Sequence, residues 1–237
     1  MGTVYRLTLR QLSGRWRLLI MTLLAAMPVA ISTLVLSFGR APTVQEFETI
    51  VLSAMLAGSI LPLIVLATGA PAFANEIEDK TLANLVLAPI SRTRIALPKL
   101  LATLTVAAPF IAVSAFATSY VAFLGDMTAS VAVTVAAIVA VAMYASAFLW
   151  LGLVTAQAIG VGLLYIVLWE GLFSGFVSGV RLLSIRHYAI ALMHGLDERR
   201  FAFGNHIPIA AAVILAVVVV SAFLWLSIRR LRRMDVP

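Results

Sequence analysis

The sequence predicts an all-α membrane protein of six transmembrane helices, and its composition, its apolar runs and the placement of its basic residues predict that fold class. Of 237 residues, 62% are hydrophobic and 11% are charged, against roughly 25% charged in soluble domains. A soluble protein of this size could not keep so much apolar surface from water, whereas lipid accepts it. We therefore expect residues 1–237 to form a single transmembrane domain.

Six apolar runs have the length of about 20 residues that a helix needs to cross the hydrocarbon core. They lie at residues 18–38, 50–74, 100–124, 128–154, 158–179 and 207–228. The fourth and fifth runs are separated only by Thr155, Ala156 and Gln157, so one bent segment is an alternative. We predict two spans there, because the combined run is too long for a single crossing. The first run also exceeds the apolar core of a signal peptide, which argues against its cleavage.

The basic residues predict the orientation, because cytoplasmic loops carry the excess of Lys and Arg. With six spans, twelve of the seventeen basic residues lie on the side of both termini: Arg6, Arg10, Arg15, Arg17, Lys80, Arg92, Arg94, Lys99, Arg229, Arg230, Arg232 and Arg233. The other five are Arg40, Arg181, Arg186, Arg199 and Arg200. We expect a multi-pass protein of the cell membrane with cytoplasmic termini. The formal charge of +7 then indicates contact with anionic lipid headgroups and control of topology, and not the binding of nucleic acid.

The first 17 residues predict an amphipathic helix in the membrane interface. Tyr5, Leu9, Leu12 and Trp16 recur at helical spacing, and Arg6, Arg10, Ser13 and Arg17 recur beside them. Such a helix places its apolar side chains in the acyl boundary and its arginines near phosphates. It is either a simple membrane anchor or an elbow that links the bundle to a cytoplasmic partner.

Residues 75–99, the predicted loop between spans two and three, form the most informative stretch. Glu76, Glu78 and Asp79 open it, and carboxylates favour a helix N-terminus. Apolar residues follow at helical spacing, Pro89 ends that helix, and Ser91 can cap the next one. The pattern fits a short amphipathic helix that packs on lipid, or one that contacts a partner.

The run EIEDKTLANLVLAPISRTRIALPKLLA resembles the segment between spans two and three in permeases of the type-2 ATP-binding-cassette (ABC) transporter family. The matching positions are Glu76 or Glu78, Thr81, Leu85, Pro89, Ser91, Arg92 and Lys99. In that family the segment is the coupling helix, which docks in a groove of the ATPase subunit. The family often has Gly before the Thr, where this chain has Lys80. We call residues 75–99 the coupling segment.

The resemblance implies that the chain is the transmembrane subunit of an ATP-driven transporter, an exporter, and not itself an enzyme. It implies a cytoplasmic ABC ATPase as partner, with ATP and Mg bound there and no cofactor on this chain. It also implies a second permease copy, in a homodimer or a homologous heterodimer, in addition to contact with membrane lipids. The expected coupling residues are Glu76, Glu78, Thr81, Leu82, Leu85, Pro89, Ser91 and Arg92.

Residues 180–206 form the predicted external segment between spans five and six. Their mixture of leucines with Arg181, Arg186 and His187 suits a helix at the interface or one that dips into the bilayer. The resemblance implies short re-entrant helices at this place. Gly171, Gly175 and Gly179 precede it at intervals of four, a stripe that lets helices pack closely.

Glu170 is the only acidic residue well inside an apolar run. An ionised carboxylate there is costly, so it should face protein or water. It is either a substrate or ion contact, or a protonated acid bonded to a neighbouring helix. We favour the second interpretation, because no basic residue lies in any predicted span to pair with it.

The motifs of membrane enzymes are missing from the sequence. Neither lysine follows a glycine as in a phosphate-binding loop, and His187, His194 and His206 do not form a zinc-binding pattern. No Gly-x-Ser-x-Gly motif marks a hydrolase. The main alternative is a stand-alone secondary transporter or channel driven by an ion gradient, with Glu170 as the ion-linked residue.

Overall fold

The computed structural model describes residues 2–37, 43–80, 91–173, 184–199, 201 and 207–233. The described residues in regular structure are helical, and their helices are α1 (Gly2–Leu12), α2 (Arg15–Ser37), α3 (Val44–Phe47), π-helix η1 (Glu48–Ile60), α4 (Leu61–Gly69), α5 (Pro71–Glu78), α7 (Thr93–Ala122), α8 (Met127–Val154), α9 (Ala158–Tyr165), π-helix η2 (Ile166–Phe173), α11 (Ile185–Leu196) and α12 (Ile209–Arg233).

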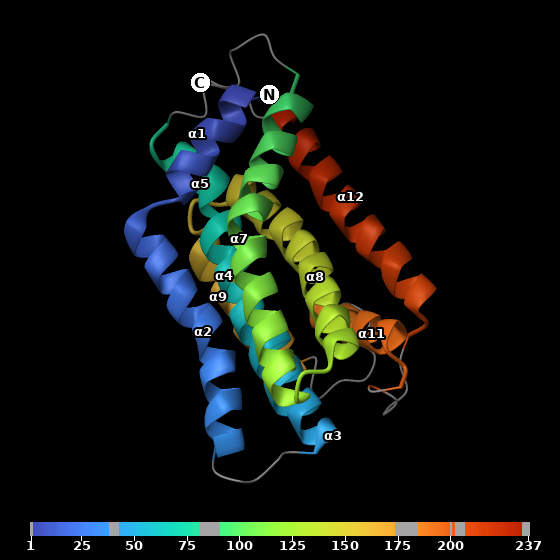
Figure 1. Ribbon diagram of the computed structural model, residues 1–237. Coiled ribbons are helices and arrows are strands. Elements are labelled where there is room, and N and C mark those ends of the chain that lie inside the picture. The colour runs from blue at the N-terminus through green and yellow to red at the C-terminus, as the bar shows by residue number, and fades with distance from the viewer. Residues whose placement is uncertain are drawn as a thin grey trace.

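The long helices form one bundle with two distinct ends (Figure 1). At one end lie α1, α5 and the last turns of α12, and we call this the α1 end. At the other lie α3, α11 and the turn between α7 and α8, and we call this the α11 end. The start and the end of the described chain therefore share one end of the bundle.

Five of the described helical stretches are long and apolar enough to cross a membrane: Arg15–Ser37, Thr49–Glu78, Thr93–Ala122, Met127–Val154 and Ile209–Arg233. A sixth apolar helix, Ala158–Gly171, is shorter within the described residues. The all-helical, polytopic fold class is thus confirmed, while the number of six crossings stays a prediction. Thr155 has extended backbone angles between α8 and α9, so the fourth and fifth predicted spans are separate helices.

Helix α8 lies at the centre of the bundle and packs against α7, α12, α4 and α11. Asp126 caps its N-terminus, because the carboxylate Oδ1 accepts from the backbone N–H groups of Thr128 and Ala129. Helices α2 and α12 lie at the periphery and expose apolar side chains such as Leu23 (64%) and Ile214 (61%). Exposed apolar surface on outer helices is what a lipid-facing bundle requires.

Small residues bring α8 and α9 close to α4 and its junction with α5. A Cβ atom added at Gly152 would collide with the backbone carbonyl of Ala70, and one added at Gly162 would collide with the Leu66 side chain. The predicted glycine stripe shows no such close approach at Gly171, where an added Cβ atom would lie 3.6 Å from Ile166 O of the same helix. Gly175 and Gly179 lie outside the described residues.

The N-terminal helix is shorter than the predicted 17 residues. It ends at Leu12, and Ser13 and Gly14 separate it from α2. Trp16 is therefore not on the apolar face of α1 but on α2, where it is 79% exposed. The physical reason is local, since the Ser13 hydroxyl donates to Leu9 O at 2.7 Å and Gly14 is a poor helix former.

Helix α1 packs against the rest of the bundle. Leu12 is fully buried, and the Tyr5 hydroxyl donates to Thr105 Oγ1 of α7 at 3.1 Å. Arg6 and Arg10 are exposed, as the amphipathic pattern predicts. The helix thus connects the start of the chain to α7 near the coupling segment.

Candidate functional site

The coupling segment lies at the α1 end, between α5 and α7. Its middle, residues 81–90, is outside the described residues, so the predicted positions Thr81, Leu82, Leu85 and Pro89 are not placed. The structure describes both flanks, and it places Glu76 and Glu78 in α5 and Ser91 and Arg92 at the start of α7.

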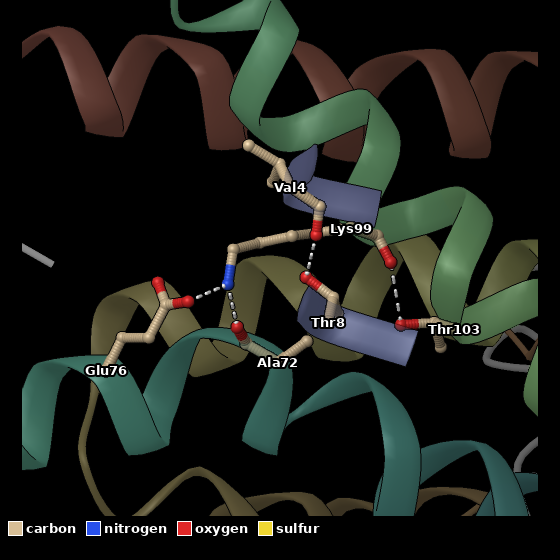
Figure 2. A network of polar contacts seen from close by, with 6 residues as sticks. All are labelled: Val4, Thr8, Ala72, Glu76, Lys99 and Thr103. Atoms are coloured by element: carbon tan, nitrogen blue, oxygen red, sulfur yellow. Dashed lines mark hydrogen bonds and ion pairs between the residues drawn. The ribbon is translucent and has the colours of Figure 1, made fainter. Parts of the chain in front are cut away.

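A buried ion pair joins the two flanks of the coupling segment (Figure 2). Lys99 of α7 is fully buried, and its Nζ lies 2.5 Å from Glu76 Oε1 of α5. The same ammonium donates to the backbone carbonyl of Ala72 and lies 4.5 Å from the centre of the Phe73 ring. These contacts supply a buried charge with the partners it needs. They fix the end of span two to the beginning of span three.

Helix α1 completes this region. It packs against both α7 and α5, and Figure 2 shows Thr8 of α1 bonded to Val4 within that helix. Thr8 is 2% exposed, and its hydroxyl donates to Val4 O at 2.9 Å, within α1 itself. The N-terminal helix, α5 and α7 therefore meet where the coupling segment leaves the bundle.

Lys80 adopts a left-handed backbone conformation, with φ of 56°, just after Asp79, the C-cap of α5. Glycine adopts this conformation without steric cost and is the usual residue at such helix ends. Lys80 adopts this turn with a side chain present, and its Cβ atom adds backbone strain.

The described coupling residues differ from the prediction in two respects. Glu76 and Glu78 were expected at the start of a helix, and instead they lie at the end of α5, which continues from span two. Glu78 and Ser91 are exposed and Arg92 is half-buried, so all three can be reached from outside the chain. We predicted that Ser91 caps α7, and this is wrong: the N-cap is Arg92, without a side-chain cap bond. The backbone carbonyl of Ser91 accepts from Arg94 N at 2.8 Å.

Glu170 lies in η2, toward the α11 end, and is fully buried. Its Oε2 accepts from the Ser184 hydroxyl at 2.5 Å. Its Oε1 accepts from the Tyr165 hydroxyl and from Ile185 N, both at 3.1 Å. The carboxylate is thus bonded to the last residue of α9 and to the start of α11.

Arg186 is the charged residue beside Glu170 that the sequence interpretation missed. Its Nη1 donates to the backbone carbonyl of Glu170 at 3.2 Å, and its Nε and Nη2 donate to Ser53 Oγ at 3.0 and 2.7 Å. Burial lowers the pKa of Arg186, and the Glu170 carboxylate opposes that shift. The sequence interpretation considered only basic residues inside the predicted spans, and Arg186 reaches the Glu170 backbone carbonyl from outside them. The sequence feature that could have indicated this contact is the position of Arg186 among the apolar residues of the external segment.

The histidines do not gather with acids into a metal site. Among the residues that the structure describes, no group of three or more His, Cys, Asp or Glu side chains could hold a metal ion. His194 is buried in α11, with its ring centre 5.7 Å from that of Phe201. The His194 side chain thus packs inside the protein.

These features define a class of protein: a helical membrane protein in which a buried ion pair, Glu76–Lys99, joins the two flanks of the coupling segment at the α1 end. Comparison with known families identifies it more closely. A family model described as an ABC-2 family transporter protein matches residues 13–189. The chain belongs to this family, and it is the membrane-spanning permease subunit of an ABC transporter. The family implies a cytoplasmic ATPase subunit as partner. A search of curated proteins finds no match.

Proposed function

We propose that this chain is the transmembrane subunit of an ATP-driven exporter, and that the coupling segment transmits ATP hydrolysis on a separate subunit to the bundle. The observation that carries the proposal is the Glu76–Lys99 ion pair at the base of that segment. A segment that moves a bundle must be joined firmly to it at both flanks. The buried pair supplies such a joint within a family whose members work with an ATPase.

The proposed division of labour follows from the chemistry present. ATP and Mg bind to the partner, and the chemical step occurs there. Closure of the ATPase pushes on residues 81–90, and α5 and α7 receive the displacement together, because Lys99 ties one to the other. Glu78 and Arg92 lie on the accessible surface beside this segment, where they can contact the ATPase.

The proposed orientation places the α1 end in the cytoplasm. The described basic residues near that end include the clusters around Arg6, Arg92 and Arg230, and the positive-inside rule puts such clusters on the cytoplasmic side. A second permease copy, identical or homologous, completes the transporter. The exposed apolar faces of α2, α9 and α12 are available to that copy and to lipid.

The test is purification of the tagged chain from its native membrane in mild detergent, followed by mass spectrometry of what accompanies it. We expect a stoichiometric soluble ATPase, and we expect Leu85→Asp to remove it, because a charge would disrupt the predicted apolar docking face. A matched control is Leu124→Asp, in the exposed turn at the α11 end (85% exposed), which should keep the ATPase. A single-chain preparation without any ATPase would contradict the proposal and favour a gradient-driven transporter.

A further inference from the structure

Helix α11 is too short to span a membrane, and it lies at the end of the bundle opposite α1 (Figure 1). The helix packs on α8 and α12, and its first turn bonds to η1 and η2 through polar groups. The polar bonds of this first turn therefore attach α11 to η1 of span two and to η2 of span five.

The bonds between α11 and η2 run in both directions. The Glu170 carboxylate of η2 accepts from Ser184 Oγ and Ile185 N at the start of α11. A carboxylate at a helix N-terminus is favoured by the unpaired N–H groups and the helix dipole. In return, Arg186 of α11 donates to the Glu170 backbone carbonyl at 3.2 Å. Each helix thus satisfies a polar group of the other in an apolar surrounding.

Arg186 also joins α11 to η1. Two of its nitrogens donate to Ser53 Oγ, at 3.0 and 2.7 Å. Gly58, one turn further along η1, leaves the space that the side chain occupies, since a Cβ there would lie 3.1 Å from Arg186 Nη1. One guanidinium therefore connects α11 to η2, which precedes it closely in the sequence, and to η1, which is far away in the sequence.

The two elements that Arg186 connects, η1 and η2, are both π-helices, and they pack against each other. The π-helix is rare, and it occurs frequently at functional sites. Packed helices change between discrete arrangements rather than deform continuously. A single charged side chain that joins two irregular helices to a short third one is placed to select between such arrangements.

We propose that Arg186 is a latch residue, which holds α11 on η1 and η2 in the resting transporter and is released during the ATP cycle. The nucleotide-dependent release rests on the proposed function, whereas the holding of α11 does not. Arg186 is a positioning residue, and Glu170 and Ser53 are its acceptors.

Hydrogen–deuterium exchange of the purified chain in nanodiscs tests the latch without knowledge of the substrate. In Arg186→Ala, the amides of Ile185–Leu196 should exchange roughly tenfold faster or more than in the wild type, because charge-assisted bonds at buried acceptors are lost. Ser53→Ala should give a smaller increase, and Arg186→Lys should keep part of the protection. Arg199→Ala, an exposed arginine after the same helix, is the matched control and should leave α11 unchanged.

The complex with its ATPase separates a latch from a fixed structural contact. With MgATP and vanadate, α11 of the wild type should exchange faster than without nucleotide, while Arg186→Ala should show no further increase. Exchange in α8 should stay the same in all variants, which excludes general unfolding. Wild-type protection of α11 in Arg186→Ala, or no effect of nucleotide on the wild-type complex, would overturn the proposal. A preparation without ATPase would contradict the proposed function, and the isolated chain would still decide whether Arg186 holds α11.

Discussion

Lys99 is a charged side chain with no exposed surface, and its environment explains how the bundle tolerates it. Glu76, the Ala72 carbonyl and the Phe73 ring surround the ammonium, so the charge is paired, hydrogen-bonded and in contact with a π face. A buried pair adds little net stability compared with apolar residues, but removal of one partner leaves an uncompensated charge. The cost of breaking the pair therefore exceeds its net contribution.

Glu76→Ala is expected to destabilise the chain by about 3 kcal/mol, because it leaves Lys99 buried with one fewer anionic partner. Glu78→Ala, two residues later on the exposed side of the same helix, should change stability by less than about 0.5 kcal/mol. The thermal unfolding midpoint in detergent measures both. Equal midpoints for the two variants would show that the ion pair does not hold α5 to α7.

Lys80→Gly is expected to stabilise the chain by about 1 kcal/mol, because it removes the strain of a side chain at φ of 56°. Lys80→Ala removes the charge but keeps the Cβ atom, so it should be close to neutral. Thermal unfolding again provides the comparison. If both variants have the same midpoint, the left-handed turn after α5 is not strained in the protein.

For single residues, the sequence indicated which positions belong to the coupling segment, but it did not indicate the partners of the buried charged side chains. Glu76 was identified from its place in a motif, whereas its contact with Lys99 depends on how α5 and α7 pack. The sequence predicts Arg186 in an external segment that lies at the interface or dips into the bilayer. Its contacts with Ser53 and Glu170 depend on how α11 packs on η1 and η2, which has no periodic signal. Pairing across 16 residues or more requires the tertiary arrangement.

Helices are held together here by small residues that let backbones approach. Gly152 of α8 faces the Ala70 carbonyl, where even a methyl group has no room. Gly160 of α9, in contrast, has no atom near a built Cβ. The two glycines differ in packing and not in helix propensity, so they form a matched pair.

Gly152→Ala should cost about 1–3 kcal/mol, because α8 must move away from the α4–α5 junction. Gly160→Ala should be neutral or stabilising by up to about 1 kcal/mol, since alanine favours the helix and meets nothing. Midpoints of thermal unfolding give the order of the two variants. A stable Gly152→Ala protein would mean that the two helices do not approach as closely as described.

The apolar runs predicted the long helices well, because lipid imposes length and composition on every span. They did not predict which glycines pack, nor that α1 ends at Leu12. The first depends on the rotation of each helix about its axis. The second depends on the Ser13–Gly14 pair, whose local bonding interrupts an otherwise continuous amphipathic pattern.

At the scale of the whole molecule, the bundle separates two polar regions. The Glu76–Lys99 pair lies at the α1 end, and the bonds around Arg186 lie toward the α11 end. Helices α7 and α8, which pack on each other, extend between these ends. A displacement at the coupling segment can therefore reach α11 through long, rigid elements.

The orientation can be measured with single cysteines, because the chain contains none. Leu124→Cys, in the turn between α7 and α8, should react with a membrane-impermeant maleimide in intact cells. Asp79→Cys, exposed at the end of α5, should react only after permeabilisation. The reverse pattern would place the coupling segment outside the cell, where no ATP-driven partner could reach it.

The measurement that tests the central claim most directly is photocrosslinking in living cells from a benzophenone amino acid at position 85, in the coupling segment. The account predicts a crosslink to one soluble ABC ATPase. The same probe at Leu196, an exposed residue of α11 (44% exposed), should give no such product. A probe at position 85 that captures only lipid, or an ATPase crosslinked equally from position 196, would contradict the assignment of residues 75–99 as the ATPase-coupling element.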